Sequence, residues 1–320
     1  MKIYYDRRHL FHLPKKELDN GEWIENPEKP ERIETIRSAL EGNGFVINEP
    51  RDYHVSHVFA VHTPEYVEWL KQKSMTVSPK REYFPEVFGY DKLFDTGTPV
   101  TTGCYIASLA GVSTVLNCVD SLLEDETVAY ALCRPPGHHA GVATGGGYCY
   151  FNNAAIATKY YQKHIRGFVA ILDLDFHHGN GTQEIFYYDD TVLYVSIHGD
   201  PRFFYPWISG NSWEIGEDSG EGFNVNFPLD GGIEGPEYIR TLTKALQEIN
   251  DFSPDLLVVS LGTDTHAADG VGHFGLIDSD FSMIGKLVGE IETPKLIIQE
   301  GGYNPQANAV SVLNFIKALK

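Results

Sequence analysis

Short, almost uninterrupted apolar runs rich in β-branched residues recur along the chain and constrain its fold more than any other feature. Strands buried on both faces of a parallel sheet have this continuous pattern, whereas strands with one solvated face alternate apolar and polar residues. Segments with helical spacing separate the runs, which predicts an α/β fold with an open, mainly parallel sheet covered by helices. The expected strands are residues 1–6, 127–133, 167–175, 191–198, 254–262 and 294–302, and the expected helices are residues 99–123, 152–164, 233–250, 279–291 and 306–319.

The composition limits the partners of the chain. Among 320 residues, 25 Lys and Arg stand against 44 Asp and Glu, a net charge of −19, which argues against binding nucleic acid through a basic face and mildly favours a cationic substrate. The opening MKIYYDRRHL has no apolar signal-peptide core, and no apolar run approaches the ~20 residues of a membrane span. We therefore expect a cytoplasmic protein without a membrane contact.

The chain shows no repeat and no linker rich in serine, glycine or proline, so we expect a single domain over residues 1–320. All four cysteines lie in apolar surroundings without a C-x-x-C pair, which favours buried free thiols over disulfides. They are Cys104, Cys118, Cys133 and Cys149.

Titratable side chains follow four of the expected strands. In parallel sheets of this class, ligands gather just beyond the carboxyl ends of the strands. We therefore expect these side chains to meet in one site. They are His138, His139, Asp173, Asp175, His177, His178, Asp264 and Tyr303.

The D-x-H spacing of Asp175 and His177 suits a metal ion. Alternate residues past a strand end point the same way, so both side chains converge while Phe176 points into apolar packing. With Asp264 from another strand they form an Asp, His, Asp set, which leaves an open position for water on Zn²⁺; Fe²⁺, Co²⁺ or Mn²⁺ suit the same donors. Alone, a D-x-H or a His-His pair is more often structural, but their combination at the strand ends predicts a metal-assisted hydrolase.

Six motifs occur in order along the chain: RPPGHHAG (134–141), GGYCYFNNAA (146–155), ILDLDFHHGNGTQ (171–183), VSIHGD (195–200), LGTD (261–264) and EGGYN (300–304). Together they resemble the signature set of the zinc-dependent histone deacetylase superfamily, over nearly the whole chain. Within it, the bacterial acetylpolyamine amidohydrolases are the most similar branch. The resemblance implies the arginase–deacetylase fold, an open α/β domain with a sheet of about eight strands.

The resemblance also implies residue roles. Asp175, His177 and Asp264 would hold the zinc ion. His139 would be the general base, and Tyr303 would donate a hydrogen bond to the carbonyl oxygen and the oxyanion that it becomes.

His138 would be the electrostatic partner of His139. The resemblance pairs His138 with Asp173, and His139 with Asn180, where several family members carry aspartate. A neutral partner should make His139 a weaker base. His178 is interpreted as structural.

A structural K⁺ ion is also common in the family. The backbone carbonyls that match such a site are those of Asp173, Asp175, His177, Ser196 and Ile197.

For the substrate, the resemblance implies a small acetylated polyamine or diamine in a narrow channel. Tyr148 and Tyr205 match aromatic wall residues, and Gly147 would let the substrate pass close to the backbone. For each of the two tyrosines, a position in the hydrophobic core is as well supported as a position in the channel wall.

Asp95 lies where this branch carries an acidic residue at the channel mouth, with Asp91 nearby, and either carboxylate could hold the distal ammonium group. Asp95 is also a candidate N-cap for the helix expected near Pro99.

Residues 74–95 have no clear periodicity and form an expected irregular loop. In the polyamine branch a longer loop here packs against a second subunit and narrows the channel, so the shorter segment leaves both a homodimer and a monomer open. A deacylase of acetyl-lysine peptides or of other small acylated amines is the alternative enzyme. A metal-lacking binding protein and a binuclear manganese ureohydrolase are disfavoured: the metal set is intact, and Gly179 stands where the latter needs a further aspartate.

Overall fold

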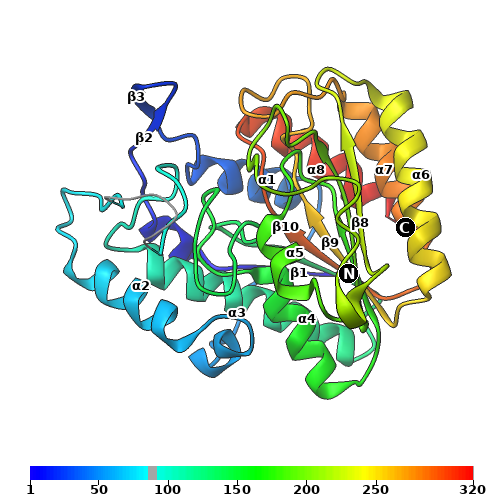
Figure 1. Ribbon diagram of the computed structural model, residues 1–320, viewed down its shortest axis with the longest axis horizontal. Coiled ribbons are helices and arrows are strands. Elements are labelled where there is room, and N and C mark those ends of the chain that lie inside the picture. The colour runs from blue at the N-terminus through cyan, green and yellow to red at the C-terminus, as the bar shows by residue number, and fades with distance from the viewer. Residues whose placement is uncertain (86–91, 320) are drawn as a thin grey trace.

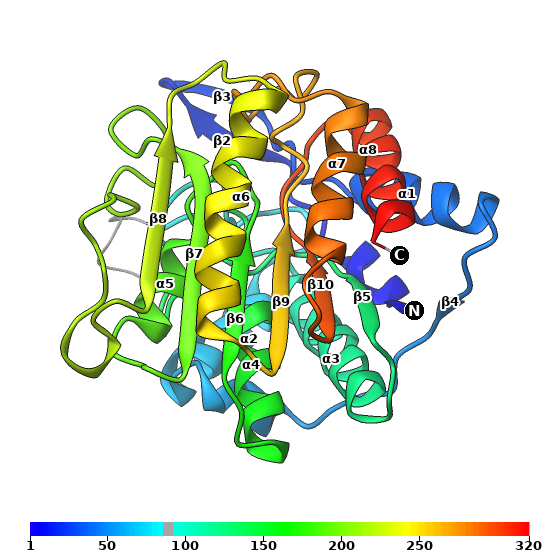
Figure 2. The same ribbon diagram turned by 90° about the vertical axis from the view of Figure 1, so that its right-hand side faces the viewer.

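Eight parallel strands form one twisted sheet in the computed structural model, which describes residues 1–85 and 92–319 (Figure 2). All seven pairings between neighbouring strands are parallel, as the sequence predicted. In sheet order the strands are β4 (Ile47–Asn48), β1 (Lys2–Tyr5), β5 (Val128–Leu132), β10 (Lys295–Gln299), β9 (Leu256–Leu261), β6 (Val169–Asp173), β7 (Val192–Gly199) and β8 (Asn224–Leu229).

Helices cover both faces of this sheet (Figures 1 and 2). The helices of one layer are α1 (Glu31–Gly42), α6 (Gly235–Phe252), α7 (Asp278–Gly289) and α8 (Pro305–Ala318). The other side carries α2 (Pro64–Thr76), α3 (Cys104–Leu123), α4 (Asn153–His164) and the short α5 (Asn180–Phe186).

Each central strand contributes to two hydrophobic cores. In β5, Ala129 and Ala131 pack in the core beneath α3 and α4, whereas Tyr130 and Leu132 pack in the core beneath α1, α7 and α8. Successive side chains of a strand point to opposite faces. A strand buried on both sides therefore has no polar positions, which explains the continuous apolar runs.

The elements that sequence analysis missed lie mostly at the edges. The edge strands β4 and β8 are only partly buried and lack a continuous apolar run. Strands β2 (Lys16–Asp19) and β3 (Glu22–Glu25) form a separate, mostly exposed hairpin with charged residues. Its turn, Asn20-Gly21, has positive φ at both residues, and an Asn-Gly pair is a hairpin signal that the sequence did contain.

The helix expected at residues 99–123 begins later, at Cys104, because Val100 pairs with Tyr83 in an isolated bridge and keeps the preceding backbone extended. Residues 74–76, at the start of the expected loop 74–95, form the last residues of α2.

Helix α3 is, among the described residues, the one helix whose length and apolar composition would suffice to cross a membrane. However, 78% of its apolar window is buried inside the molecule, as in the core helix of a globular fold. The four cysteines, two of them in α3, are buried and free, as predicted.

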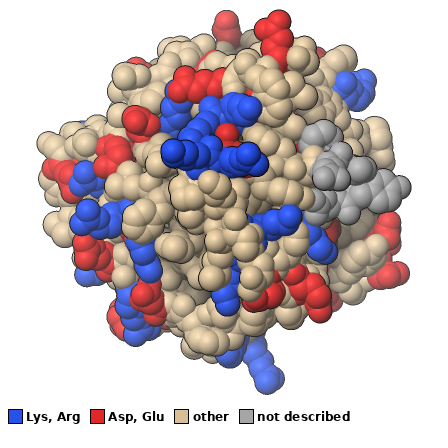
Figure 3. Space-filling model, turned by 90° about the vertical axis from the view of Figure 1, so that its left-hand side faces the viewer, with Lys and Arg blue, Asp and Glu red and all other residues tan. Residues whose placement is uncertain are grey.

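Charged side chains of both signs share the face drawn in Figure 3. A few lysine and arginine side chains gather near its top, but acidic and uncharged residues surround them (Figure 3).

Candidate active site

The predicted site residues follow four strands that are neighbours in the sheet, although they are far apart in the sequence. The order β5-β10-β9-β6 brings together the loops that carry the histidine pair, Tyr303, Asp264 and the D-x-H segment. All four loops leave from carboxyl ends of parallel strands, so they meet on one edge.

Asp175, His177 and Asp264 are buried, and their ligand atoms lie within 4.8 Å of one another. His177 Nδ1 lies 2.9 Å from Asp264 Oδ2 and 3.3 Å from Asp175 Oδ1. Backbone N–H groups hold the carboxylates in place: His177 N and Gly301 N donate to Asp175, and Phe176 N donates to Asp264.

This set fits a divalent cation. Two buried carboxylates need a compensating charge, and within residues 1–85 and 92–319 no lysine or arginine pairs with either one. Burial and then the nearby Asp175 raise the pKa of Asp264 to about 7, so a bound cation would have to stabilise its anionic form. Carboxylate and imidazole are ordinary zinc ligands.

The two adjacent histidines have different partners. His138 Nδ1 lies 3.0 Å from Asp173 Oδ2, which also accepts from the Tyr194 hydroxyl. His139 Nδ1 lies 2.7 Å from the Asn180 Oδ1. Because that amide oxygen only accepts, Nδ1 of His139 carries the proton and its Nε2 is left with a lone pair.

The electrostatics of this pair differ accordingly. Burial alone would lower the pKa of His138, but the carboxylates of Asp173 and Asp175 outweigh it and raise this pKa to about 10. Burial, and next the charges of His138 and His177, lowers the pKa of His139 well below its usual value. Near neutral pH this pair therefore consists of a charged His138 and a neutral His139.

Tyr303 follows β10 at the same edge of the sheet. Its backbone N–H donates to Asp269 Oδ2 at 2.6 Å, and its ring packs 5.4 Å from that of Tyr148. The Arg32 guanidinium lies 4.6 Å from the centre of the Tyr303 ring and donates to the carbonyls of Glu300 and Gly302. The Tyr303 hydroxyl has no hydrogen-bond partner among the described residues.

Tyr205 and Gly147 lie against the His139 ring. The Tyr205 ring stands edge-on to His139 with centroids 4.9 Å apart, and its hydroxyl donates to Asp95 Oδ2 at 2.6 Å. Gly147 has φ +52°, and a Cβ there would lie 2.1 Å from His139 Cδ2. Position 147 therefore requires glycine because the His139 ring lies close to it. Sequence analysis instead explained the glycine by a substrate that passes close to the backbone.

Asp95 does not cap α3, so the N-cap interpretation is wrong. Gly103 precedes α3 and provides no side-chain cap. The Oδ1 of Asp95 accepts from the backbone N–H and hydroxyl of Thr98, and its Oδ2 accepts from Gly147 N as well as Tyr205. Asp91 lies outside the described residues.

Sequence analysis assigned no role to Glu17 or to Glu300, the first residue of the EGGYN motif. Glu17, in β2, accepts from the Tyr148 hydroxyl at 3.3 Å, and burial, helped by Asp95 and Asp19, raises its pKa to about 7. Glu300 accepts from Gly137 N at 2.6 Å. No local pattern marks Glu17, because only the folded hairpin brings it to Tyr148.

The structure also gives the locations of the remaining predicted residues. Asp173 of β6 pairs with Ser196 of β7, so the backbone positions expected to bind K⁺ lie on neighbouring strands and the following loop. His178 is fully buried, with Nδ1 3.1 Å from Ser209 Oγ and its ring 4.6 Å from that of His198.

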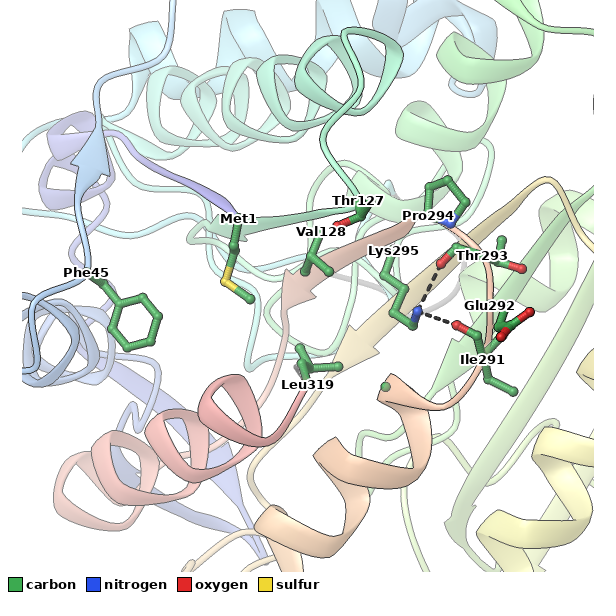
Figure 4. A pocket seen from close by; sticks show the side chains of 11 residues that line it. Met1, Phe45, Thr127, Val128, Ile291, Glu292, Thr293, Pro294, Lys295 and Leu319 are labelled. Atoms are coloured by element: carbon green, nitrogen blue, oxygen red, sulfur yellow. Dashed lines mark hydrogen bonds between the residues drawn. The ribbon is translucent and has the colours of Figure 1, made fainter.

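A cavity of about 510 Å³ lies at the opposite end of the sheet, beside the residues that begin β1, β5 and β10 (Figure 4). Its lining contains none of the predicted site residues. Lys295, which lines it, donates from Nζ to the carbonyls of Ile291 and Thr293. This cavity is therefore separate from the candidate site at the carboxyl edge.

Comparisons with known proteins agree with this geometry. Residues 26–319 match the model of the histone deacetylase domain family. Acetylpolyamine amidohydrolase of Burkholderia pseudomallei is 36% identical, and acetylpolyamine amidohydrolase 2 of Pseudomonas aeruginosa is 33% identical. Both alignments cover 100% of this chain, with 100% and 99% of the relative.

Two solved structures are also similar over 100% of this chain. The crystal structure of acetylpolyamine aminohydrolase from Burkholderia pseudomallei superposes with a TM-score of 0.93 at 34% identity, covering 98% of that chain. The HD domain of HDA15 superposes with a TM-score of 0.88 at 30% identity, covering 90% of that chain.

Proposed function

Because this chain belongs to the histone deacetylase domain family, we propose that it hydrolyses the acetyl amide of small acetylated polyamines or diamines, releasing acetate and the free amine. The observation that carries the proposal is the gathering of the buried Asp175, His177 and Asp264 at the edge of the sheet that also carries the neutral His139 and Tyr303. Full-length similarity to acetylpolyamine amidohydrolases supports the substrate class.

The family implies a metal cofactor, and we assign Zn²⁺ to Asp175, His177 and Asp264, with Fe²⁺ or Co²⁺ as alternatives. When bound, the ion would polarise the amide carbonyl and lower the pKa of water toward ~7. His139 Nε2 takes a proton from the attacking water and passes it to the departing nitrogen. The Tyr303 hydroxyl donates to the carbonyl oxygen as negative charge develops there.

The channel wall supports a cationic substrate. The rings of Tyr148, Tyr205 and Tyr303 offer apolar contact to a methylene chain, and the carboxylates of Asp95 and Glu17 lie behind two of these rings. Negative charge beside an apolar wall favours an ammonium group at the distal end.

Four further assignments belong to this proposal. A structural K⁺ ion at the carbonyls named above fits the family pattern. We also propose a homodimer, a cytoplasmic location and a single domain over residues 1–320.

Steady-state hydrolysis tests the substrate class. We expect the zinc-loaded protein to prefer acetylputrescine, acetylcadaverine or acetylspermidine over an acetyl-lysine peptide by orders of magnitude in kcat/KM. Preference for the peptide would overturn the polyamine assignment and favour the alternative, a deacylase of acetyl-lysine peptides.

A further inference from the structure

A second group of possible metal ligands adjoins the first. Ligand atoms of His138, Cys149 and Glu300 lie within 4.8 Å of one another, and all three residues are buried. They come from the loop after β5, the segment before α4 and the end of β10. None of them belongs to the Asp175, His177 and Asp264 set.

Each of these residues has a donor atom to offer. His138 directs Nδ1 to Asp173, which orients the ring and leaves Nε2, the arrangement in which a carboxylate supports a metal-binding imidazole. Glu300 Oε2 accepts from the N–H groups of Gly137 and His138, whereas its buried Oε1 has no hydrogen-bond partner among the described residues. Cys149 Sγ donates to the carbonyl of Gly147 at 3.3 Å.

The local charge also favours a further cation. Four buried carboxylates lie around the two sets, those of Asp173, Asp175, Asp264 and Glu300. In the parts of the chain that the structure describes, neither lysine nor arginine forms an ion pair with them. The charged His138 offsets one of these negative charges and the divalent ion of the first site offsets two, whereas the buried Glu300 Oε1 without a partner is costly.

We propose that His138, Cys149 and Glu300 form a second, inhibitory site for a borderline-soft divalent cation such as Zn²⁺, Co²⁺ or Cd²⁺. Thiolate, imidazole and carboxylate together suit such ions. Binding displaces the thiol proton of Cys149 and the Nε2 proton of the charged His138, and both protons leave to solvent. A metal ion bound to His138 Nε2 prevents this imidazole from acting as the electrostatic partner of His139. Excess metal therefore stops turnover.

Cobalt titration of the metal-free protein tests this site, because the first site contains no sulfur. We expect two equivalents of Co²⁺ to bind, with a near-ultraviolet thiolate-to-cobalt band that grows only with the second equivalent. Cys149→Ser should lose the band and the second equivalent. Cys118→Ser, which removes another fully buried thiol, should keep both. Binding of only one equivalent without a band, or a band that persists in Cys149→Ser, would overturn the proposal.

Two further variants separate this site from the proposed activity. Asp264→Asn should abolish hydrolysis yet retain the band, so a failed deacetylase assay leaves the second site testable. Glu300→Gln keeps an acceptor for the Gly137 and His138 N–H groups and should weaken the second equivalent by more than about 10-fold. Unchanged affinity in Glu300→Gln would exclude this carboxylate as a ligand.

Discussion

At the scale of single residues, the Tyr303 hydroxyl is the donor that the proposed reaction depends on. Its ring is held by Arg32 and Tyr148, whereas its hydroxyl has no partner among the described residues. Tyr303→Phe should therefore retain the fold and lower kcat by about 10²–10³-fold, the usual loss for one oxyanion donor. Steady-state kinetics with the preferred acetylated amine measures this effect.

Tyr4→Phe is the matched control, because that hydroxyl contacts Ser121 far from the site. The control should keep full turnover. Turnover within about threefold of the parent in Tyr303→Phe would remove the oxyanion role from this residue.

The site residues differ in how far the sequence could reveal them. Asp175 and His177 are neighbours in a D-x-H segment after a strand, so local geometry was enough to group them. Glu17 and Glu300 act through contacts with segments distant in the sequence, 131 and 163 residues away. No local spacing encodes such contacts.

At the scale of elements, the β2–β3 hairpin brings a carboxylate to the channel wall. Glu17 contacts the Tyr148 hydroxyl, and its raised pKa of about 7 means that its negative charge appears as the pH rises through neutrality. Glu17→Gln keeps a hydrogen-bond acceptor but removes that charge. We expect KM for a cationic acetylated amine to rise by about 5-fold at pH 8, the effect of one partly solvated ion pair.

The hairpin offers its own control. Asp19 lies on the same strand and is exposed, so Asp19→Asn changes the net charge equally without touching Tyr148. Its KM should stay at the parent value. An equal rise of KM in both variants would attribute the effect to long-range charge. The difference in KM between the parent and Glu17→Gln should vanish at pH 5, because Glu17 is protonated there in the parent.

The same hairpin shows which kind of element cannot be predicted from apolar periodicity. The central strands were predicted because burial on both faces leaves an uninterrupted apolar pattern. The hairpin strands KELD and EWIE have one mostly exposed face and carry charges, so apolar periodicity could not mark them. Their Asn20-Gly21 turn was the readable signal.

At the scale of the whole molecule, His62 ties together segments that the sheet alone does not join. It follows the short helix at Val55–Ala60, its Nδ1 donates to the carbonyl of Gly141 at 2.9 Å, and its Nε2 accepts from Asn152 N at 2.8 Å. Asn152 caps α4 and donates to the carbonyl of Ala140. The loop that carries the histidine pair is thus anchored from the side opposite the sheet.

This anchor should make stability depend on pH. Burial lowers the pKa of His62 from 6.5 to about 4, although the carbonyl of Gly141 acts in the opposite direction. Between these values the unfolded chain binds a proton that the folded chain does not, so the free energy of unfolding falls as the pH falls, by about 1.4 kcal/mol per pH unit. His62→Gln can form both hydrogen bonds but does not titrate, so denaturant unfolding between pH 6 and pH 4.5 should show a slope smaller by this amount. The exposed His273→Gln should retain the parent slope, and parallel slopes for the parent and His62→Gln would mean that His62 is not held neutral in the fold.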